Sequence, residues 1–147
     1  MSAFDISATG LTAQRVRMDV IANNIANAQT LVTREGEPYR RRTVVFETIG
    51  RHFNEALTSA HRRLARIIGG GVKVSRVIED RTPSAFQKVY DPSHPFADST
   101  GIVLRPNINV VQEMVDMIDA SRGYEANVTA LNSTKQILSK ALEIGRA

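Results

Sequence analysis

A seven-residue apolar repeat near the C-terminus constrains the fold of this chain more than any other sequence feature. The repeat consists of Val110, Met117, Tyr124, Leu131 and Leu138. Residues at this spacing lie on one face of an α-helix, and a strict period of seven favours a left-handed supercoiled contact with another helix. The repeat predicts a helix over residues 110–144, which at ~1.5 Å per residue would be roughly 50 Å long.

The residues on either side of this segment fit a helix with defined ends. Asn109 followed three residues later by Gln112 is a capping-box pattern, and Pro106 lies just upstream. Gly145 provides a stop after the last apolar residues.

A second apolar pattern begins at the N-terminus. Phe4, Leu11, Met18 and Ile25 recur every seven residues and predict a helix over residues 3–28. Other apolar residues lie off this stripe, so the helix has a second apolar face. Such a helix requires two sets of neighbours and would be marginal alone in water.

Between the two predicted helices the pattern changes to short β-rich runs separated by breakers. Residues 39–49, 72–78 and 86–90 predict strands, and residues 101–104 are a weaker fourth candidate. Residues 51–68 carry apolar side chains at helical spacing and several arginines, which predicts a short basic amphipathic helix. The predicted fold class is α+β: long N- and C-terminal helices form a coiled-coil-like pair, and a small β-rich module is inserted between them.

The positive charge of the chain is concentrated in this middle region. Residues 34–76 carry a net charge of +6, whereas the whole chain carries +4. Such a segment could dock against an acidic protein neighbour, form a solvated face, or bind nucleic acid or an anionic membrane. The candidate partner-docking residues are Arg62, Arg63 and Arg66.

The sequence contains no constellation that predicts catalysis, metal binding or cofactor binding. It has no Cys, and His52, His61 and His94 have no partner at metal-ligand spacing. Residues 69–73 contain glycines and a lysine but lack the spacing of a phosphate-binding loop. We therefore expect no enzymatic activity, no metal and no cofactor.

No segment approaches the roughly 20 apolar residues that span a bilayer. The N-terminus carries Asp5 and has neither the positive nor the apolar region of a cleavable signal peptide. If the protein works outside the cytoplasm, we expect another route to export it.

Two terminal motifs are more specific than the helical periodicity. One is Ser7–Gln14 (SATGLTAQ) followed by Ala22–Thr30 (ANNIANAQT), and the other is Glu113–Val128 (EMVDMIDASRGYEANV). Together they resemble the paired terminal signatures of the flagellar axial proteins, which are the rod, hook and hook-associated subunits. The short chain, the loop Asp91–Asp98 (DPSHPFAD) and Pro106–Val110 (PNINV) resemble the proximal-rod members of that family.

The resemblance implies a structural subunit of the proximal rod of the bacterial flagellar basal body. Such subunits polymerise through their terminal helices into the drive shaft that transmits torque for motility. The implied partners are other copies of the chain, the rod proteins FlgB, FlgF and FlgG, the rod–ring adaptor FliE, and the flagellar type III export apparatus. No small-molecule substrate and no nucleic acid are expected.

The implied location is the rod that spans the periplasm, reached without a cleaved signal peptide. On this interpretation residues 1–30 and 107–147 form a helical polymerisation core domain, and residues 31–106 form a small outer module. The alternative is a cytosolic helical adaptor that binds nucleic acid or anionic membrane through its basic middle segment.

Several residues within the motifs have a direct physical interpretation. Asn27 alone could end the first helix, or the asparagines of the motif could form an amide network between subunits. Gly10 and Gly123 lie inside predicted helices and would permit a close helix–helix approach, or else mark a tolerated weak point. The candidate assembly-interface residues are Leu11, Met18, Asn23, Asn24, Ile25, Asn27, Val110, Met114, Met117, Tyr124, Asn127, Val128, Leu131 and Leu138.

Overall fold

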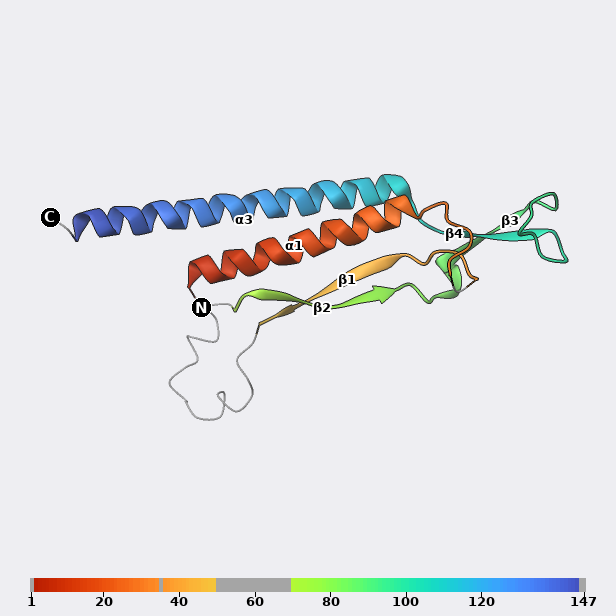
Figure 1. Cartoon of the computed structure of the whole chain (residues 1–147), viewed down its shortest axis with the longest axis horizontal. Coiled ribbons are helices and arrows are strands. Elements are labelled where there is room, and N and C mark those ends of the chain that lie inside the picture. Colours follow the sequence, from red (N-terminus) through yellow and green to blue (C-terminus); the bar gives the residue numbers. More distant parts are fainter. Residues whose placement is uncertain (1, 35, 50–69, 146–147) are drawn as a thin grey trace, which may run out of the picture. The chain divides into compact units, whose positions relative to one another are not determined.

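A computed structural model describes residues 2–34, 36–49 and 70–145 of the 147-residue chain (Figure 1). Two long helices enclose a strand-rich middle region in the sequence, so the predicted α+β fold class is confirmed. The predicted helix at residues 51–68 lies outside the described residues. The elements are α1 (Ala3–Ala26), β1 (Arg42–Thr48), β2 (Val72–Glu79), the 3-10 helix η2 (Pro83–Ala85), β3 (Phe86–Tyr90), β4 (Ile102–Pro106) and α3 (Val110–Ile144).

Helix α3 has the bounds that the heptad repeat and its flanking residues predict. Asn109 Oδ1 accepts hydrogen bonds from the backbone N–H groups of Val111 and Gln112, at 3.0 and 3.2 Å. Asn109 therefore caps the N-terminus of the helix by binding amides that have no partner within it. At the other end, Gly145 N–H bonds to the carbonyl of Ala141 and closes the last turn.

Helix α1 begins with a reciprocal capping box. Asp5 N–H donates to Ser2 Oγ at 3.2 Å, and Ser2 N–H donates to Asp5 Oδ2 at 2.8 Å. The helix ends at Ala26, two residues before the predicted end, because the chain then tightens: Ala28 N–H bonds to the carbonyl three residues back, at Ile25. The next turn is closed by Thr30 N–H, which bonds to the carbonyl of Asn27.

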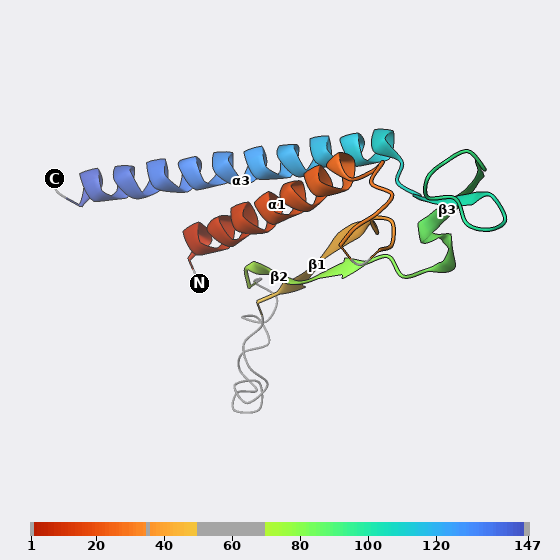
Figure 2. The same ribbon diagram turned by 45° about the vertical axis from the view of Figure 1, so that its right-hand side comes forward.

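Within the described residues, the strands form two separate two-stranded sheets. One contains β1 and β2, and the other contains β3 and β4, which are antiparallel with Phe86 opposite Pro106 and Tyr90 opposite Ile102. The predicted strand at residues 39–49 begins only at Arg42, because Tyr39 is buried and its N–H bonds to the carbonyl of Thr30 instead. Figure 1 labels both β3 and β4, and Figure 2 shows the loop that follows β3 from another side.

The chain divides into two compact units, and each contains part of both long helices. The first unit comprises Met1–Val16, Val45–Arg76 and Ala120–Ala147, and the second comprises Arg17–Val44 and Val77–Asp119. In the first unit the buried apolar residues of the two helices are Ala13 and Ala120. In the second they are Ile21, Tyr39, Ala85 and Val103.

None of the helices in the described part of the chain is long and apolar enough to cross a membrane.

Candidate assembly interface

A fully bonded asparagine forms the centre of the second unit. Asn24 Nδ2 donates to the carbonyl of Arg42 at 2.8 Å and to Glu113 Oε2 at 2.9 Å. Its Oδ1 accepts from Tyr39 Oη at 3.1 Å and from Arg42 N–H at 2.9 Å. The amide thus makes all four hydrogen bonds available to it. It binds both the carbonyl and the N–H group of Arg42, as the backbone of a neighbouring strand would. One side chain therefore joins α1, β1 and α3.

Glu113 supplies the negative charge of this cluster and is 1% exposed. Arg41 Nε lies 2.6 Å from Glu113 Oε1, and a terminal nitrogen of the same guanidinium lies 3.5 Å from Asp116 Oδ2. A buried carboxylate is costly unless it is paired and hydrogen-bonded, and here both oxygens have a partner. The arrangement fixes the segment before β1 against the first turns of α3.

Burial raises the pKa of the Tyr39 phenol, while the positive charge of Arg42 opposes the shift. The hydroxyl therefore stays protonated and keeps donating to Asn24 Oδ1 well into the alkaline range. The name Asn24 cluster is used below for Asn24, Tyr39, Arg41 and Glu113.

Most of the basic side chains that the structure describes in the middle region have acidic partners within the chain. Arg40 pairs with Glu37 at 2.8 Å and its guanidinium stacks over Phe86, with 4.4 Å to the ring centroid. Arg42 pairs with Glu79 at 2.8 Å. The positive charge that the sequence concentrates here is thus partly neutralised within the protein. Arg62, Arg63 and Arg66 lie outside the described residues.

In the first unit the two helices approach closely at two glycines. A Cβ atom at Gly10 of α1 would lie 2.7 Å from Asn127 Oδ1 of α3, and a Cβ atom at Gly123 would lie 3.0 Å from Gln14 Nε2. The absence of a side chain at each position makes room for a polar side chain of the other helix, so the predicted close approach is confirmed. Asn127 Nδ2 also bonds to the Gly123 carbonyl at 2.8 Å, and this holds the side chain over Gly10.

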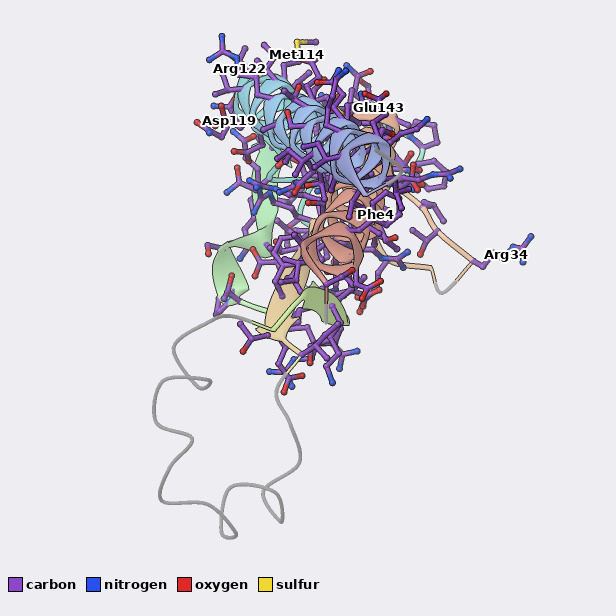
Figure 3. The ribbon with its side chains drawn as sticks, turned by 90° about the vertical axis from the view of Figure 1, so that its left-hand side faces the viewer. Phe4, Arg34, Met114, Asp119, Arg122 and Glu143 are labelled. Carbon is purple, nitrogen blue, oxygen red and sulfur yellow. The ribbon has the colours of Figure 1, made fainter. Side chains whose placement is uncertain are left out.

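Outside these contacts, the beginning of α3 carries an uncovered apolar stripe. Val111, Met114, Val115 and Ile118 follow the spacing i, i+3, i+4, i+7, and their exposed fractions run from 46% to 70%. Residues at this spacing share one face of a helix. Figure 3 shows Met114 pointing outward from the ribbon of α3. The name α3 stripe is used below for these four residues.

The structure places the candidate assembly-interface residues in different environments. Asn24 is buried, whereas Asn23, Met114 and Leu138 are exposed. Asn23 and Asn27 donate to backbone carbonyls of their own helix, at Asp19 and Asn23 respectively. The half-buried candidates are Leu11, Met18, Ile25, Asn27, Val110, Met117, Tyr124, Asn127, Val128 and Leu131.

Sequence reasoning missed three members of the Asn24 cluster and most of the α3 stripe. Glu113 lies seven residues before the fully buried Ala120 and is buried on the same side of α3, a placement that the structure shows and the local sequence does not signal. The stripe was obscured because the heptad repeat through Val110 and Met117 marks a different face of the same helix. Only Met114 belonged to both sets.

The described residues contain no group of three His, Asp or Glu side chains arranged to hold a metal ion.

Comparison with known proteins gives matches at both ends and along the whole chain. The family model described as flagella basal body rod protein matches residues 4–30, and the model described as flagellar basal body rod FlgEFG protein C-terminal matches residues 99–144. The chain is 47% identical to the flagellar basal-body rod protein FlgC of Bacillus subtilis (strain 168), in an alignment covering 99% of this chain and 100% of that protein.

Two further relatives carry the same name. The chain is 44% identical to the protein of Borreliella burgdorferi, over 97% of this chain and 95% of the relative. It is 42% identical to the protein of Escherichia coli O6:H1, over 99% of this chain and 98% of the relative. With this identity over nearly the full length of both partners, the chain belongs to the family of the flagellar basal-body rod protein FlgC.

Proposed function

We propose that the chain is a structural subunit of the proximal rod of the bacterial flagellum, which polymerises through its terminal helices into the shaft that transmits torque. The single observation that carries the proposal is the α3 stripe. Four large apolar side chains are left in contact with water on one helix face, and contiguous surfaces of this kind mark sites of protein association. The family relationship supports a rod as the assembly in which that surface is covered.

The candidate interface residues divide into two roles in this proposal. The exposed ones, Asn23, Met114 and Leu138, contact neighbouring subunits directly. Asn24 and Asn127 act indirectly and so present a fixed surface to the neighbour. The bond from Asn24 to Glu113 holds α1 against α3, and the bond from Asn127 to the Gly123 carbonyl holds the Asn127 side chain over Gly10 of α1. A rigid surface loses less conformational entropy on association than a mobile one.

The domain division and the partners follow from the same proposal. Residues 1–30 with 107–147 form the polymerisation core, and residues 31–106 form the outer module. The partners are further copies of the chain, FlgB, FlgF and FlgG, the adaptor FliE, and the type III export apparatus, and the location is the rod across the periplasm. We also propose that the protein has no catalytic activity, because assembly into a shaft requires none. Arg62, Arg63 and Arg66 are proposed to dock against an acidic protein neighbour.

The alternative of an adaptor for nucleic acid or anionic membrane is not favoured. Arg40, Arg41 and Arg42, which stand at the start of the basic segment, are each paired with a carboxylate of the same chain. A phosphate group of a nucleic acid or a lipid would have to displace these carboxylates from the three arginines.

Clean deletion of the gene in its motile source organism tests the function. The deletion should abolish swimming and external filaments, and a plasmid copy of the gene should restore both. Normal swimming after deletion, with no second copy of the gene present, would reject the proposed function.

A further inference from the structure

Helix α3 continues beyond the start of α1 within the first unit. Gly10 lies opposite Asn127 and Gln14 lies opposite Gly123, so an advance of four residues along α1 corresponds to a retreat of four along α3. Extending this antiparallel register places the first residue of α1 opposite Thr134. Residues 135–144 of α3 therefore have no α1 residue beside them, and Figures 1 and 2 both show this end projecting past α1. At ~1.5 Å per residue the projection is about 15 Å long.

The face of α3 that packs on α1 keeps its heptad spacing into this projection. Ala120 is fully buried. Counting on from Ala120 in alternating steps of four and three residues gives four half-buried positions: 124, 127, 131 and 134. The same steps lead next to Leu138, which is 55% exposed, and to Ala141. Beside them, Ile137 and Leu142 add two exposed apolar side chains. The residues 135–144 are called the α3 overhang below.

Helix α1 carries an apolar heptad stripe that its own α3 does not fully cover. Phe4 lies seven residues before Leu11, and these two side chains are exposed and half-buried respectively. Gly10, which faces α3, lies on a different side of the helix from Leu11, because adjacent helical residues point about 100° apart. The first unit thus has two incompletely covered surfaces of the same period, one at the end of α3 and one at the start of α1.

We propose that the α3 overhang binds the Phe4–Leu11 stripe of α1 in a second copy of this chain. The proposal rests on the proposed function, and it names which two surfaces meet when subunits assemble. A second copy is the occupant that fits, because the overhang repeats the heptad surface that already holds an α1 helix within the subunit. Two different surfaces of each copy are used, and in a head-to-tail arrangement this contact adds subunits without closing a dimer.

The charges of the two surfaces are compatible with this contact. Residues 135–144 contain Lys135, Lys140 and Glu143, and Lys140 is paired with Glu143 at 2.8 Å. Residues 3–14 of α1 contain one charged side chain, Asp5, whose pKa is lowered by its hydrogen bonds to Ser2. The overhang thus carries a net positive charge, and the negative Asp5 of the facing stripe is of the opposite sign.

Cysteine cross-linking tests the contact directly, because the chain has no native Cys and every cross-link must come from an introduced residue. Cells lacking the chromosomal gene would express two tagged copies together, one carrying Leu138→Cys and the other Phe4→Cys. In basal bodies isolated from these cells, mild oxidation should give the mixed dimer at least ten-fold more efficiently than the control pair Gln136→Cys and Phe4→Cys. Gln136 belongs to the same overhang but lies on the opposite side of α3. A yield no higher than that of the control pair overturns the inference.

A second variant separates the proposed neighbour from other ways of covering the overhang. Leu138→Asp combined with Leu142→Asp should lower the melting temperature of the isolated monomer no more than a matched control does, and should abolish the mixed dimer. The matched control is Gln136→Asp combined with Lys140→Asp on the other side of the overhang, since Asp near a helix C-terminus is itself unfavourable. A larger fall in the monomer melting temperature for the Leu138 and Leu142 variant than for this control would show that the chain covers its own overhang, and would overturn the inference. If cells that express the Leu138→Cys and Phe4→Cys copies swim but their rods give no 138–4 cross-link, the proposed function stands and only this contact is overturned.

Discussion

Asn24 and Glu113 are joined by a hydrogen bond of 2.9 Å although they lie 89 residues apart, and each side chain is 1% exposed. The bond connects the last turns of α1 with the first turn of α3. Because the same amide also binds both backbone groups of Arg42, the bond helps to fix where β1 begins. A fully satisfied buried network of this kind specifies one arrangement, since each alternative arrangement would leave a buried polar group without a partner.

Asn24→Asp should destabilise the monomer by about 3 kcal/mol or more, because it places a second carboxylate beside Glu113 and removes two donors. Denaturant unfolding of the purified chain measures the change. Asn23→Asp is the matched control, since Asn23 is exposed and bonds only to the Asp19 carbonyl of its own helix. That variant should change the free energy of unfolding by less than about 1 kcal/mol. Equal effects of the two substitutions would show that the Asn24 cluster has no special role.

Gly10→Ala should lower the free energy of unfolding by about 1 kcal/mol, because the new methyl group collides with the Asn127 side chain. In an Asn127→Ala background the collision disappears, and Gly10→Ala should instead stabilise by up to about 1 kcal/mol through its higher helix propensity. A double-mutant cycle measured by denaturant unfolding gives the coupling between the two positions. Additive effects would contradict the close approach of α1 and α3 at this point.

Gly123→Ala should be tolerated better than Gly10→Ala. Its methyl group would meet the far end of the flexible Gln14 side chain at 3.0 Å, and that side chain can turn away. Thermal unfolding measures the melting temperature of both variants. A larger fall for Gly10→Ala would show that Asn127, whose Nδ2 is bonded to the Gly123 carbonyl, moves aside less readily than Gln14.

Ile118→Asp should abolish swimming while leaving the monomer folded, because Ile118 belongs to the α3 stripe and is 54% exposed. A charge there makes no unfavourable contact in the monomer but would be buried in an assembled rod. Swimming of the complemented deletion strain and circular dichroism of the purified chain are the two measurements. Asn132→Asp introduces the same charge at an exposed polar position of α3 and should swim normally. Normal swimming of the Ile118 variant would exclude the α3 stripe from the interface.

The loop between β3 and β4 should loosen on acidification below about pH 4. The hydroxyl of Thr100 and the backbone N–H groups of Ile102 and Thr100 lower the pKa of Asp98 below its ordinary value of 3.8. The lowered pKa means that these bonds stabilise the loop fully above the ordinary value, and that this stabilisation is lost as the pH falls through the folded-state pKa.

Amide chemical shifts of Thr100 and Ile102, followed by NMR as the pH is lowered, measure this transition. Asp98→Asn keeps an oxygen acceptor at the same position but cannot titrate, so it should remove the transition without opening the loop at neutral pH. A transition of unchanged midpoint in the Asn variant would assign it to another group.

The sequence predicts the helices well because their signals are local. The bounds of α3 follow from the heptad repeat together with Asn109, and hydrogen bonds to Val111 and Gln112 confirm that cap. The strand at Phe86–Tyr90 also has the predicted bounds. In each case the residues that determine the element lie within it or directly beside it.

The Asn24 cluster could not be predicted in the same way. Its members come from three segments, and nothing in their local spacing indicates that Tyr39, Arg41 and Glu113 meet around one amide. The same long-range contact explains the error at the start of β1, where a β-rich run was predicted from residue 39. Tyr39 has high strand propensity, but burial and its hydrogen bonds to Thr30 and Asn24 take it out of the ladder.

Quantitative mass spectrometry of purified basal bodies tests the central claim, that this chain is a subunit of the flagellar rod, most directly. Basal bodies from the source organism should contain the chain at a fixed ratio to the other rod proteins, and it should remain after washes that remove loosely bound proteins. Motile cells whose washed basal bodies lack the chain would contradict the claim.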